Sequence, residues 1–148
     1  MARKENLKNR YRRLDRLVKI PAEGEKAIRS DVLITFPYRY PGQLQEVTID
    51  TEEFTALCPW TGLPDSGRLE IRYVPGRLLL ELKSLKYYLL SFRSVGIVQE
   101  HAAARILRDL VKVLQPRRLE VALDYRLRGG LHTTVRVFWP EEDRKQSV

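Results

Sequence analysis

The chain has very few of the residues that build disulfides and metal sites: one cysteine and two histidines among 148 residues. A single cysteine excludes a disulfide within the chain, so nothing indicates an oxidising compartment. Cys58, His101 and His132 offer no ligand cluster of recognised spacing, and no bound metal is expected. No apolar run approaches the about 20 residues needed to span a membrane. The N-terminus lacks the apolar core of a secretory signal, and a cytoplasmic location is the expectation.

Positive charge is abundant but unevenly distributed. The formal net charge is +8, and residues 1–19 hold eight basic residues against Glu5 and Asp15. The remaining chain is nearly balanced, with 19 basic and 17 acidic residues. The excess therefore belongs to an N-terminal arm, which we interpret as a solvated or partner-contacting segment. RNA binding by this arm is the less favoured interpretation, and a nucleic-acid partner is not expected.

Length and composition predict one globular domain with a sizeable core, at 43% hydrophobic and 31% charged residues. We predict a basic, partly extended arm over residues 1–31, a single catalytic domain over 32–140 and a polar tail over 141–148. Residues 32–36 (VLITF) and 47–50 (VTID) are candidate short strands.

Alternating apolar and polar residues predict strands in two places. Residues 69–74 (LEIRYV) read as a half-buried strand, and the turn at Pro75-Gly76 predicts that residues 77–82 return beside it. Residues 117–128 alternate strictly, with Leu127 as the last inward position. Gly129-Gly130 then predicts a turn into a final strand over residues 131–139.

Helical spacing of apolar residues separates these strand pairs. A short helix is predicted from about Lys83, and a longer one over residues 99–116 that ends at Pro116. The resulting order is strand, strand, helix, helix, strand, strand. Short turns make paired strands antiparallel, so the predicted fold class is α+β with two helices on one face of an antiparallel sheet.

The segment CPWTGLPDSG holds the only thiol. Pro59 and Pro64 disfavour helical geometry for the residues before them, so Cys58 and Asp65 lie on a stiff, non-helical backbone. A thiolate that attacks and an acid that donates a proton would suit nucleophilic catalysis. The non-catalytic alternative is a buried, unreactive cysteine beside a turn-forming aspartate. Spacing alone leaves both interpretations open.

Several motifs taken together carry a family resemblance. They are CPWTGLPD (58–65), ELKSLKYY (81–88), SFR (91–93), QEH (99–101) and RGG (128–130). In this order the chain resembles the short, single-module NADPH-dependent 7-cyano-7-deazaguanine reductases of queuosine biosynthesis, a tRNA-modification pathway. The resemblance runs from about Phe54 to Thr133. It implies the tunnelling fold, in ββααββ order, and reduction of a nitrile to a primary amine by two NADPH.

The resemblance also implies roles for individual residues. Cys58 is similar to the nucleophile that forms a covalent thioimide, and Asp65 to the acid that protonates the nitrile nitrogen. The residues similar to substrate contacts are Leu80, Glu81, Leu82, Gln99 and Glu100. Those similar to cofactor contacts are Lys83, Ser84, Lys86, Arg128 and Gly129. Without the resemblance, the lysines would read as a solvated helix face and Glu100 as a first-turn acid favoured by the helix dipole.

One departure and several alternatives accompany the resemblance. Many members carry histidine where this chain has Gln99, and glutamine cannot donate a proton near neutral pH. Members of this length are similar to homo-decamers of two pentamers, with active sites between subunits. The nearest rival is a relative that adds ammonia to the same nitrile in tRNA without NADPH. A basic RNA-binding module is the alternative of another class, and zinc-dependent pterin-forming enzymes of this fold need ligands that are missing here.

Overall fold

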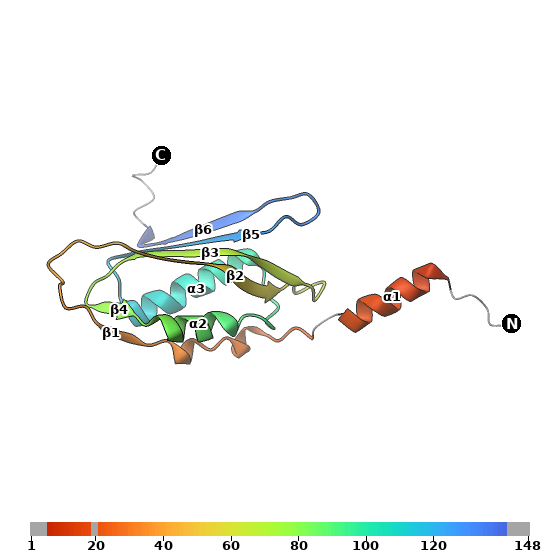
Figure 1. Ribbon diagram of the computed structural model, residues 1–148, viewed down its shortest axis with the longest axis horizontal. Coiled ribbons are helices and arrows are strands. Elements are labelled where there is room, and N and C mark those ends of the chain that lie inside the picture. The colour runs from red at the N-terminus through yellow and green to blue at the C-terminus, as the bar shows by residue number, and fades with distance from the viewer. Residues whose placement is uncertain (1–5, 19–20, 142–148) are drawn as a thin grey trace.

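A four-stranded antiparallel sheet forms one layer of the protein, with strand order β2-β3-β5-β6. The computed structural model describes residues 6–18 and 21–141. Two helices, α2 and α3, cover one face of the sheet (Figure 1). The elements are α1 (Leu7–Val18), β1 (Thr35–Pro37), β2 (Val47–Leu57), β3 (Pro64–Val74), β4 (Leu78–Leu80), α2 (Leu82–Leu90), α3 (Gln99–Leu114), β5 (Arg118–Tyr125) and β6 (Thr134–Trp139). The α+β class is confirmed.

The predicted hairpin between residues 69–74 and 77–82 is wrong. Strand β3 pairs with β2 on one edge and with β5 on the other, so neither edge is left for the chain that follows Pro75-Gly76. Residues 78–80 form β4, which pairs with β1 in a separate two-stranded sheet. The first hairpin of the ββααββ order is therefore β2–β3, and its connection carries Cys58.

Strand β2 extends well beyond the candidate strand at residues 47–50. The prediction stopped early because a bulge interrupts the alternation of apolar and polar residues. The pairing register with β3 shifts between Thr51 and Phe54. A bulge reverses which positions face the core, so a strict alternation is lost at Glu52 and Glu53. After the bulge Phe54 and Ala56 face the core and are buried.

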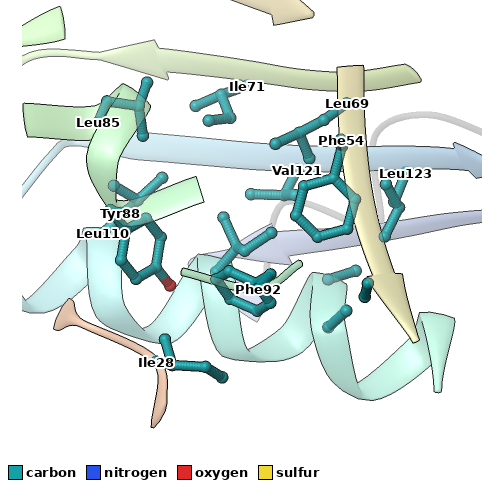
Figure 2. Packing of buried hydrophobic residues seen from close by; sticks show 14 of the residues in the cluster. Ile28, Phe54, Leu69, Ile71, Leu85, Tyr88, Phe92, Leu110, Val121 and Leu123 are labelled. Carbon is teal, nitrogen blue, oxygen red and sulfur yellow. The ribbon is translucent and has the colours of Figure 1, made fainter. Parts of the chain in front are cut away.

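The core lies between the sheet and the two helices, as Figure 2 shows for residues of β3, β5, α2 and α3. The predicted alternation is confirmed for Leu69, Ile71 and Tyr73 of β3, all buried. In β5 the buried face ends with Tyr125, because the strand ends there, and Leu127 is exposed rather than inward. Buried apolar area of this kind contributes about 25 cal/mol per Å².

A close approach of two backbones at the end of the core requires glycine. Gly67 of β3 stands opposite Tyr125 of β5. A Cβ atom placed on Gly67 would lie 2.0 Å from the carbonyl oxygen of Asp124. Any larger residue would push the two strands apart, since neither atom belongs to a flexible side chain.

Both predicted helices are confirmed, and both have clear end signals. Helix α2 begins at Leu82, after Glu81 accepts hydrogen bonds from the N–H groups of Lys83 and Ser84. Helix α3 ends at Leu114, where Gln115 takes the left-handed conformation with φ of 48° and Pro116 follows. These local rules, N-capping and a proline stop, are readable in sequence.

The chain before the sheet consists of α1 and a segment packed on the body. Figure 1 shows α1 lying away from the sheet and the other helices. Residues 21–34 return to the body, where Ile28 is buried in the core. The predicted domain limits at residues 31 and 140 stay predictions, and from residue 142 the predicted tail lies outside the described residues. Across the described ranges, no helix is long and apolar enough to cross a membrane.

Candidate active site

Cys58 lies at the end of β2, as the first residue of the turn into β3. Its backbone N–H donates to the carbonyl of Leu63 at 2.9 Å, and its own carbonyl accepts from the N–H of Gly62 at 2.8 Å. Gly62 has φ of 68°, a left-handed conformation that glycine adopts without steric cost. The loop is thus closed by its own backbone, which fixes where the thiol points.

A second strand-like contact fixes the base of the loop. Leu57 donates its N–H to Val95 at 2.9 Å, and Ile97 donates to the carbonyl of Leu57 at 3.0 Å. A Cβ on Gly96, between them, would lie 3.3 Å from Cα of Pro59. The segment before α3 therefore packs directly under the Cys58 loop, and it brings the N-terminus of α3 to the same end of the molecule.

The thiol of Cys58 is half-buried, and its surroundings favour the thiolate. Burial raises the pKa of Cys58, but hydrogen bonds from the Thr61 hydroxyl and from the N–H groups of Thr61 and Trp60 outweigh it. The negative charge of Asp65 raises the pKa as well, yet the net shift is downward. A lowered pKa is what a nucleophilic cysteine requires.

Asp65 lies in β3 directly opposite Ala56 of β2, on the face of the sheet that carries the core. Its side chain is 6% exposed. Arg128 donates from Nη1 to Oδ2 of Asp65 at 2.8 Å. The buried carboxylate thus has one cationic partner, which reaches it from the connection between β5 and β6.

Arg128 was predicted as a cofactor contact, and the structure gives it two partners within the chain. Besides Asp65, its guanidinium lies over the ring of Tyr125, 5.3 Å from the ring centre. Gly129 follows with φ of 57° and open space around the position of a Cβ. A cofactor contact by Arg128 or Gly129 stays a prediction; the side chain is 48% exposed, so part of the guanidinium faces solvent.

Tyr125 is a member of this cluster that sequence reasoning missed. Its hydroxyl is fully buried and has no hydrogen-bond partner in the described part of the chain. Burial strongly raises the pKa of Tyr125, and the charges of Asp65 and Glu100 raise it further while Arg128 lowers it. The hydroxyl stays neutral as a result, and the ring supports Arg128 from beneath.

Gln99 and Glu100 open α3 at the same end of the molecule. Gln99 is buried and donates from Nε2 to the carbonyls of Leu123 and Thr133, each at 2.8 Å. Its Oε1 has no hydrogen-bond partner among residues 6–18 and 21–141. Glu100 is exposed in the first turn. Gln99 is therefore a tether between α3 and the β5–β6 hairpin, and its predicted substrate contact remains a prediction.

The other predicted substrate and cofactor residues lie around the start of α2. Leu80 is buried, and its backbone N–H donates to the Tyr73 hydroxyl at 3.2 Å. Glu81 caps α2, and its bonds from the Lys83 and Ser84 N–H groups hold the pKa of Glu81 below its usual range. The hydroxyl of Ser84 donates to Glu81 and accepts from Ile34. These internal bonds position the segment, while Leu82 and Lys83 are exposed.

The two groups of predicted site residues lie at opposite ends of β3. Asp65 is near its start, whereas Tyr73, which contacts Leu80, is near its end. Eight residues of extended strand span about 26 Å. Figure 1 shows the same separation, with the β2–β3 turn at one end of the four-stranded sheet and β4 near the other. Within one chain, the residues near Cys58 and Asp65 lie together, but the segment that begins at Leu80 lies at the far end of β3 from them.

An apolar groove of about 550 Å³ runs between β2 and α2. Its lining is mostly apolar, with Glu53 and the cations Lys86 and Arg93. Lys86 and Arg93 form no ion pair within the described ranges, so the groove carries unpaired positive charge. Apolar walls with fixed cations suit an amphipathic anion such as a phosphorylated dinucleotide, and the predicted cofactor fits this donor set.

Sequence reasoning singled out Cys58 and Asp65 but missed residues that contact them or shift the pKa of Cys58. Thr61 acts on the thiol of Cys58 from within the same turn, and only the turn geometry shows it. The pairing of Arg128 with Asp65 joins positions 63 residues apart, for which the sequence offers no local signal. Across the described residues, no group of three or more His, Cys, Asp or Glu side chains is placed to hold a metal ion.

Sheet, helices and site together define a tunnelling-fold protein with a half-buried thiol and a buried carboxylate at one end of the sheet. The family model of the QueF-like proteins matches residues 64–144. The chain belongs to the QueF-like family, and the resemblance read from the motifs is confirmed.

Similar proteins carry one name. A protein of Caldicellulosiruptor bescii is 54% identical over 112 residues, which are 76% of this chain and 86% of that protein. A protein of Thermoanaerobacter pseudethanolicus is 51% identical over 112 residues, 76% and 84% of the two chains. One of Caldanaerobacter subterraneus is 48% identical over 120 residues, 81% and 90%. All three are named NADPH-dependent 7-cyano-7-deazaguanine reductase.

A solved structure supports the fold. The crystal structure of the archaeosine synthase QueF-Like, in its apo form, aligns with a TM-score of 0.59 and 22% sequence identity. The alignment covers 63% of this chain and 91% of that one. At this identity the likeness shows the shared tunnelling fold alone.

Proposed function

We propose that this protein is an NADPH-dependent nitrile reductase that converts 7-cyano-7-deazaguanine to 7-aminomethyl-7-deazaguanine. The observation that carries the proposal is that Cys58, whose pKa is lowered, and the buried carboxylate of Asp65 lie at the same end of the β2–β3 hairpin, close enough for the charge of Asp65 to act on the thiol. Family membership and the shared name of relatives at 48–54% identity support the same activity.

Cys58 opens the reaction as the nucleophile. Its thiolate adds to the nitrile carbon, which forms the S–C bond of a thioimide and moves one C–N electron pair onto nitrogen. We assign to Asp65, which Arg128 contacts at 2.8 Å, the transfer of the Cys58 thiol proton to that nitrogen. The thiol proton thus ends on the imide nitrogen, and the step needs no outside acid.

NADPH, when bound, supplies hydride, and two equivalents with two protons balance the conversion of a nitrile to a primary amine. Collapse of the reduced adduct breaks the S–C bond and returns the thiolate of Cys58. Hydrogen bonds from Thr61 and Trp60 stabilise that thiolate each time it forms, which makes it a better leaving group. The residues proposed to hold the cofactor are Lys83 and Lys86, with Arg128 and Gly129 as further contacts.

The deazaguanine ring needs acceptors for its N–H edge, and Glu100 is an exposed carboxylate at this end of the molecule. We propose that Glu100 accepts these hydrogen bonds. This chain has Gln99 where many relatives have histidine. Both amide hydrogens of Gln99 are donated to backbone carbonyls. Only its Oε1 would remain to accept from a ligand or a bound water.

We further propose that complete sites form between two copies of the chain. The segment from Leu80 to Lys83 lies at the far end of β3 from Cys58, so one chain alone does not unite the predicted contacts. A second copy would supply that segment. Both outer strands of the sheet, β2 and β6, have an unpaired edge within the described chain, and such edges favour pairing between copies.

Two co-expressed variants test the shared site. Cys58→Ala removes the nucleophile, and Glu81→Gln removes a predicted substrate carboxylate while its amide oxygen still caps α2. If sites form between copies, random mixing restores roughly a quarter of the wild-type rate, since one site in four receives both intact halves. Mixed oligomers that stay as inactive as the separate variants would contradict the shared site.

The reductase itself is tested by NADPH oxidation with purified protein and 7-cyano-7-deazaguanine, alongside Cys58→Ala. Two NADPH consumed per nitrile, abolished by the substitution, is the expected result. Intact-mass measurement without NADPH should show a substrate adduct on the wild type only. An adduct without any NADPH consumption would instead favour the ammonia-adding rival, whose product is an amidine in tRNA.

A further inference from the structure

A buried tyrosine, an aspartate and an arginine form a complete hydrogen-bonded group between α2 and α3, here called the helix cluster. Tyr88 of α2 donates its hydroxyl to Oδ2 of Asp109 at 2.9 Å. Arg105 donates from Nε to the same oxygen at 2.8 Å. Hydroxyl, carboxylate and guanidinium are therefore all bonded to one another within the chain, as buried polar groups normally are.

The same three residue types meet near the nucleophile, as the site cluster of Tyr125, Asp65 and Arg128, but one bond is left unmade. Arg128 donates to Oδ2 of Asp65 at 2.8 Å and lies over the Tyr125 ring. The Tyr125 hydroxyl is fully buried and bonds to no residue in the described part of the chain. A buried hydroxyl without a partner costs stability that phenylalanine at the same place would avoid. Folding alone therefore does not explain why position 125 carries a hydroxyl.

The register of the sheet makes Tyr125 and Asp65 diagonal neighbours. Gly67 of β3 stands directly opposite Tyr125, and Asp65 is the next residue on the same buried face of β3. Diagonal neighbours lie about 7–8 Å apart, within reach of an aromatic side chain. Since Gly67 has no side chain, the ring of Tyr125 can lie over β3 beside the aspartate. The charge of Asp65 accordingly acts on the Tyr125 hydroxyl.

Arg128 is the member of the site cluster that can change partners. Its side chain is 48% exposed, whereas Arg105 of the helix cluster is 16% exposed. The proposed function gives Arg128 a contact with NADPH, whose phosphates would compete with Asp65 for the guanidinium. A buried carboxylate that loses its cation is strongly disfavoured unless another donor replaces that cation.

We propose that Tyr125 is a positioning residue for Asp65: its hydroxyl donates to the Asp65 carboxylate when Arg128 turns to the bound dinucleotide. The inference rests on the proposed reductase function, in which Asp65 transfers a proton to the nitrile nitrogen. The exchange keeps the carboxylate in place while the cation is engaged elsewhere. A neighbouring cation favours the ionised form of a carboxylate more than a neutral hydroxyl does, so the exchange suits a group that must carry a proton.

Tyr125→Phe removes only the hydroxyl and leaves the ring in place. With 7-cyano-7-deazaguanine and NADPH, kcat should fall roughly 10-fold while KM changes by less than about twofold. Without NADPH, Arg128 still holds Asp65, so formation of the Cys58 adduct, followed by intact mass, should keep a rate within about twofold of wild type. Tyr88→Phe is the matched control, because it removes the hydroxyl of the helix cluster. Its kcat should stay within about twofold of wild type.

A stability cycle tests the exchange without any turnover. Arg128→Met keeps an apolar stem over the Tyr125 ring but removes the donors, so the Tyr125 hydroxyl becomes the partner of Asp65. In the wild-type background Tyr125→Phe should leave the melting temperature unchanged or raise it, because the hydroxyl is unpaired within the described chain. In the Arg128→Met background the same change should lower it by about 2–6 °C. Tyr88→Phe should lower it equally in both backgrounds.

Each outcome decides for or against the exchange. An unchanged kcat in Tyr125→Phe would overturn the role, and the reductase would still stand on its own assay. Equal losses of turnover and of adduct formation would also overturn it, because the hydroxyl would then act while Arg128 is in place. Strictly additive melting temperatures would do the same, even if the wild type consumed no NADPH and the proposed function failed. Loss of turnover alone, with destabilisation only in the Arg128→Met background, is the expected result.

Discussion

Arg128 donates to Asp65 across 2.8 Å and so joins the β5–β6 connection to β3, the strand that carries this buried carboxylate. The pair has unequal exposure: the Asp65 side chain is 6% exposed and that of Arg128 48%. A buried carboxylate that loses its cation keeps the cost of desolvation without its compensation. Loss of this ion pair should therefore affect both folding stability and the proposed chemistry at this end of the sheet.

Removing Arg128 should be tested as one half of a double-mutant cycle. Arg128→Gln leaves the buried Asp65 carboxylate unpaired and should lower the free energy of unfolding by about 1–3 kcal/mol. In an Asp65→Asn background the same change should cost much less, because no charge is then left buried. Urea unfolding of the four proteins measures the coupling, and strictly additive losses would show that the pair contributes nothing.

The Thr61 hydroxyl should control the pH dependence of thiol reactivity. Hydrogen bonds from Thr61 lower the pKa of Cys58, so Thr61→Val should raise that pKa and reduce the thiolate fraction at neutral pH. The rate of iodoacetamide alkylation plotted against pH should move to higher pH. Thr61→Ser, which keeps the hydroxyl, should follow the wild-type curve. A Thr61→Val curve that coincides with wild type would remove the hydroxyl from the account of thiol activation.

Gly67 should tolerate no side chain. A Cβ there would lie 2.0 Å from the Asp124 carbonyl oxygen, so Gly67→Ala must separate β3 from β5. We expect a loss of about 3 kcal/mol or more in the free energy of unfolding, in the range of severe core disruption. Gly42→Ala is the matched control, because no atom lies within 4 Å of its Cβ position. Chemical denaturation of both variants gives the comparison.

Substitution of Gln99 should reduce folding stability more than it reduces substrate binding. Gln99→Leu leaves the carbonyls of Leu123 and Thr133 without a donor and should cost about 1–3 kcal/mol of unfolding free energy. Gln99→Glu should cost at least as much, since a carboxylate cannot donate to either carbonyl. Thermal unfolding and KM are measured together. A higher KM at unchanged stability would instead make Gln99 a substrate contact and not a tether.

Local signals predicted the elements better than the pairing between them. Alternation identified β3 and β5, and apolar spacing identified α2 and α3, with Pro116 marking the end of α3, because these patterns depend on one segment at a time. The predicted pairing of β3 with residues 77–82 was wrong. A Pro-Gly turn leads to a hairpin only if the strand before it has a free edge. That edge is occupied by β5, more than 40 residues later, which no turn motif encodes.

The candidate site shows the same division. Cys58 opens a short turn that Pro59 restricts, and Asp65 follows that turn near the start of β3, so their proximity follows from local sequence. Arg128 and Tyr125 reach the carboxylate through tertiary packing, and the bulge at Thr51–Phe54 hid the second half of β2 from pattern reading. Register and bulges depend on two strands at once, which is why a single pattern does not show them.

The turn that begins at Cys58 is held by contacts with distant parts of the chain. Glu23 bonds through its backbone to Ser94 and Gly96, and the same segment bonds to Leu57 at the base of the loop. Closing such long loops costs chain entropy before any contact repays it. In kinetic terms, we expect the β5–β6 hairpin to form early and the seat of Cys58 to be among the last regions to assemble. A newly made chain would therefore acquire its reactive thiol environment only once the rest of the fold is in place.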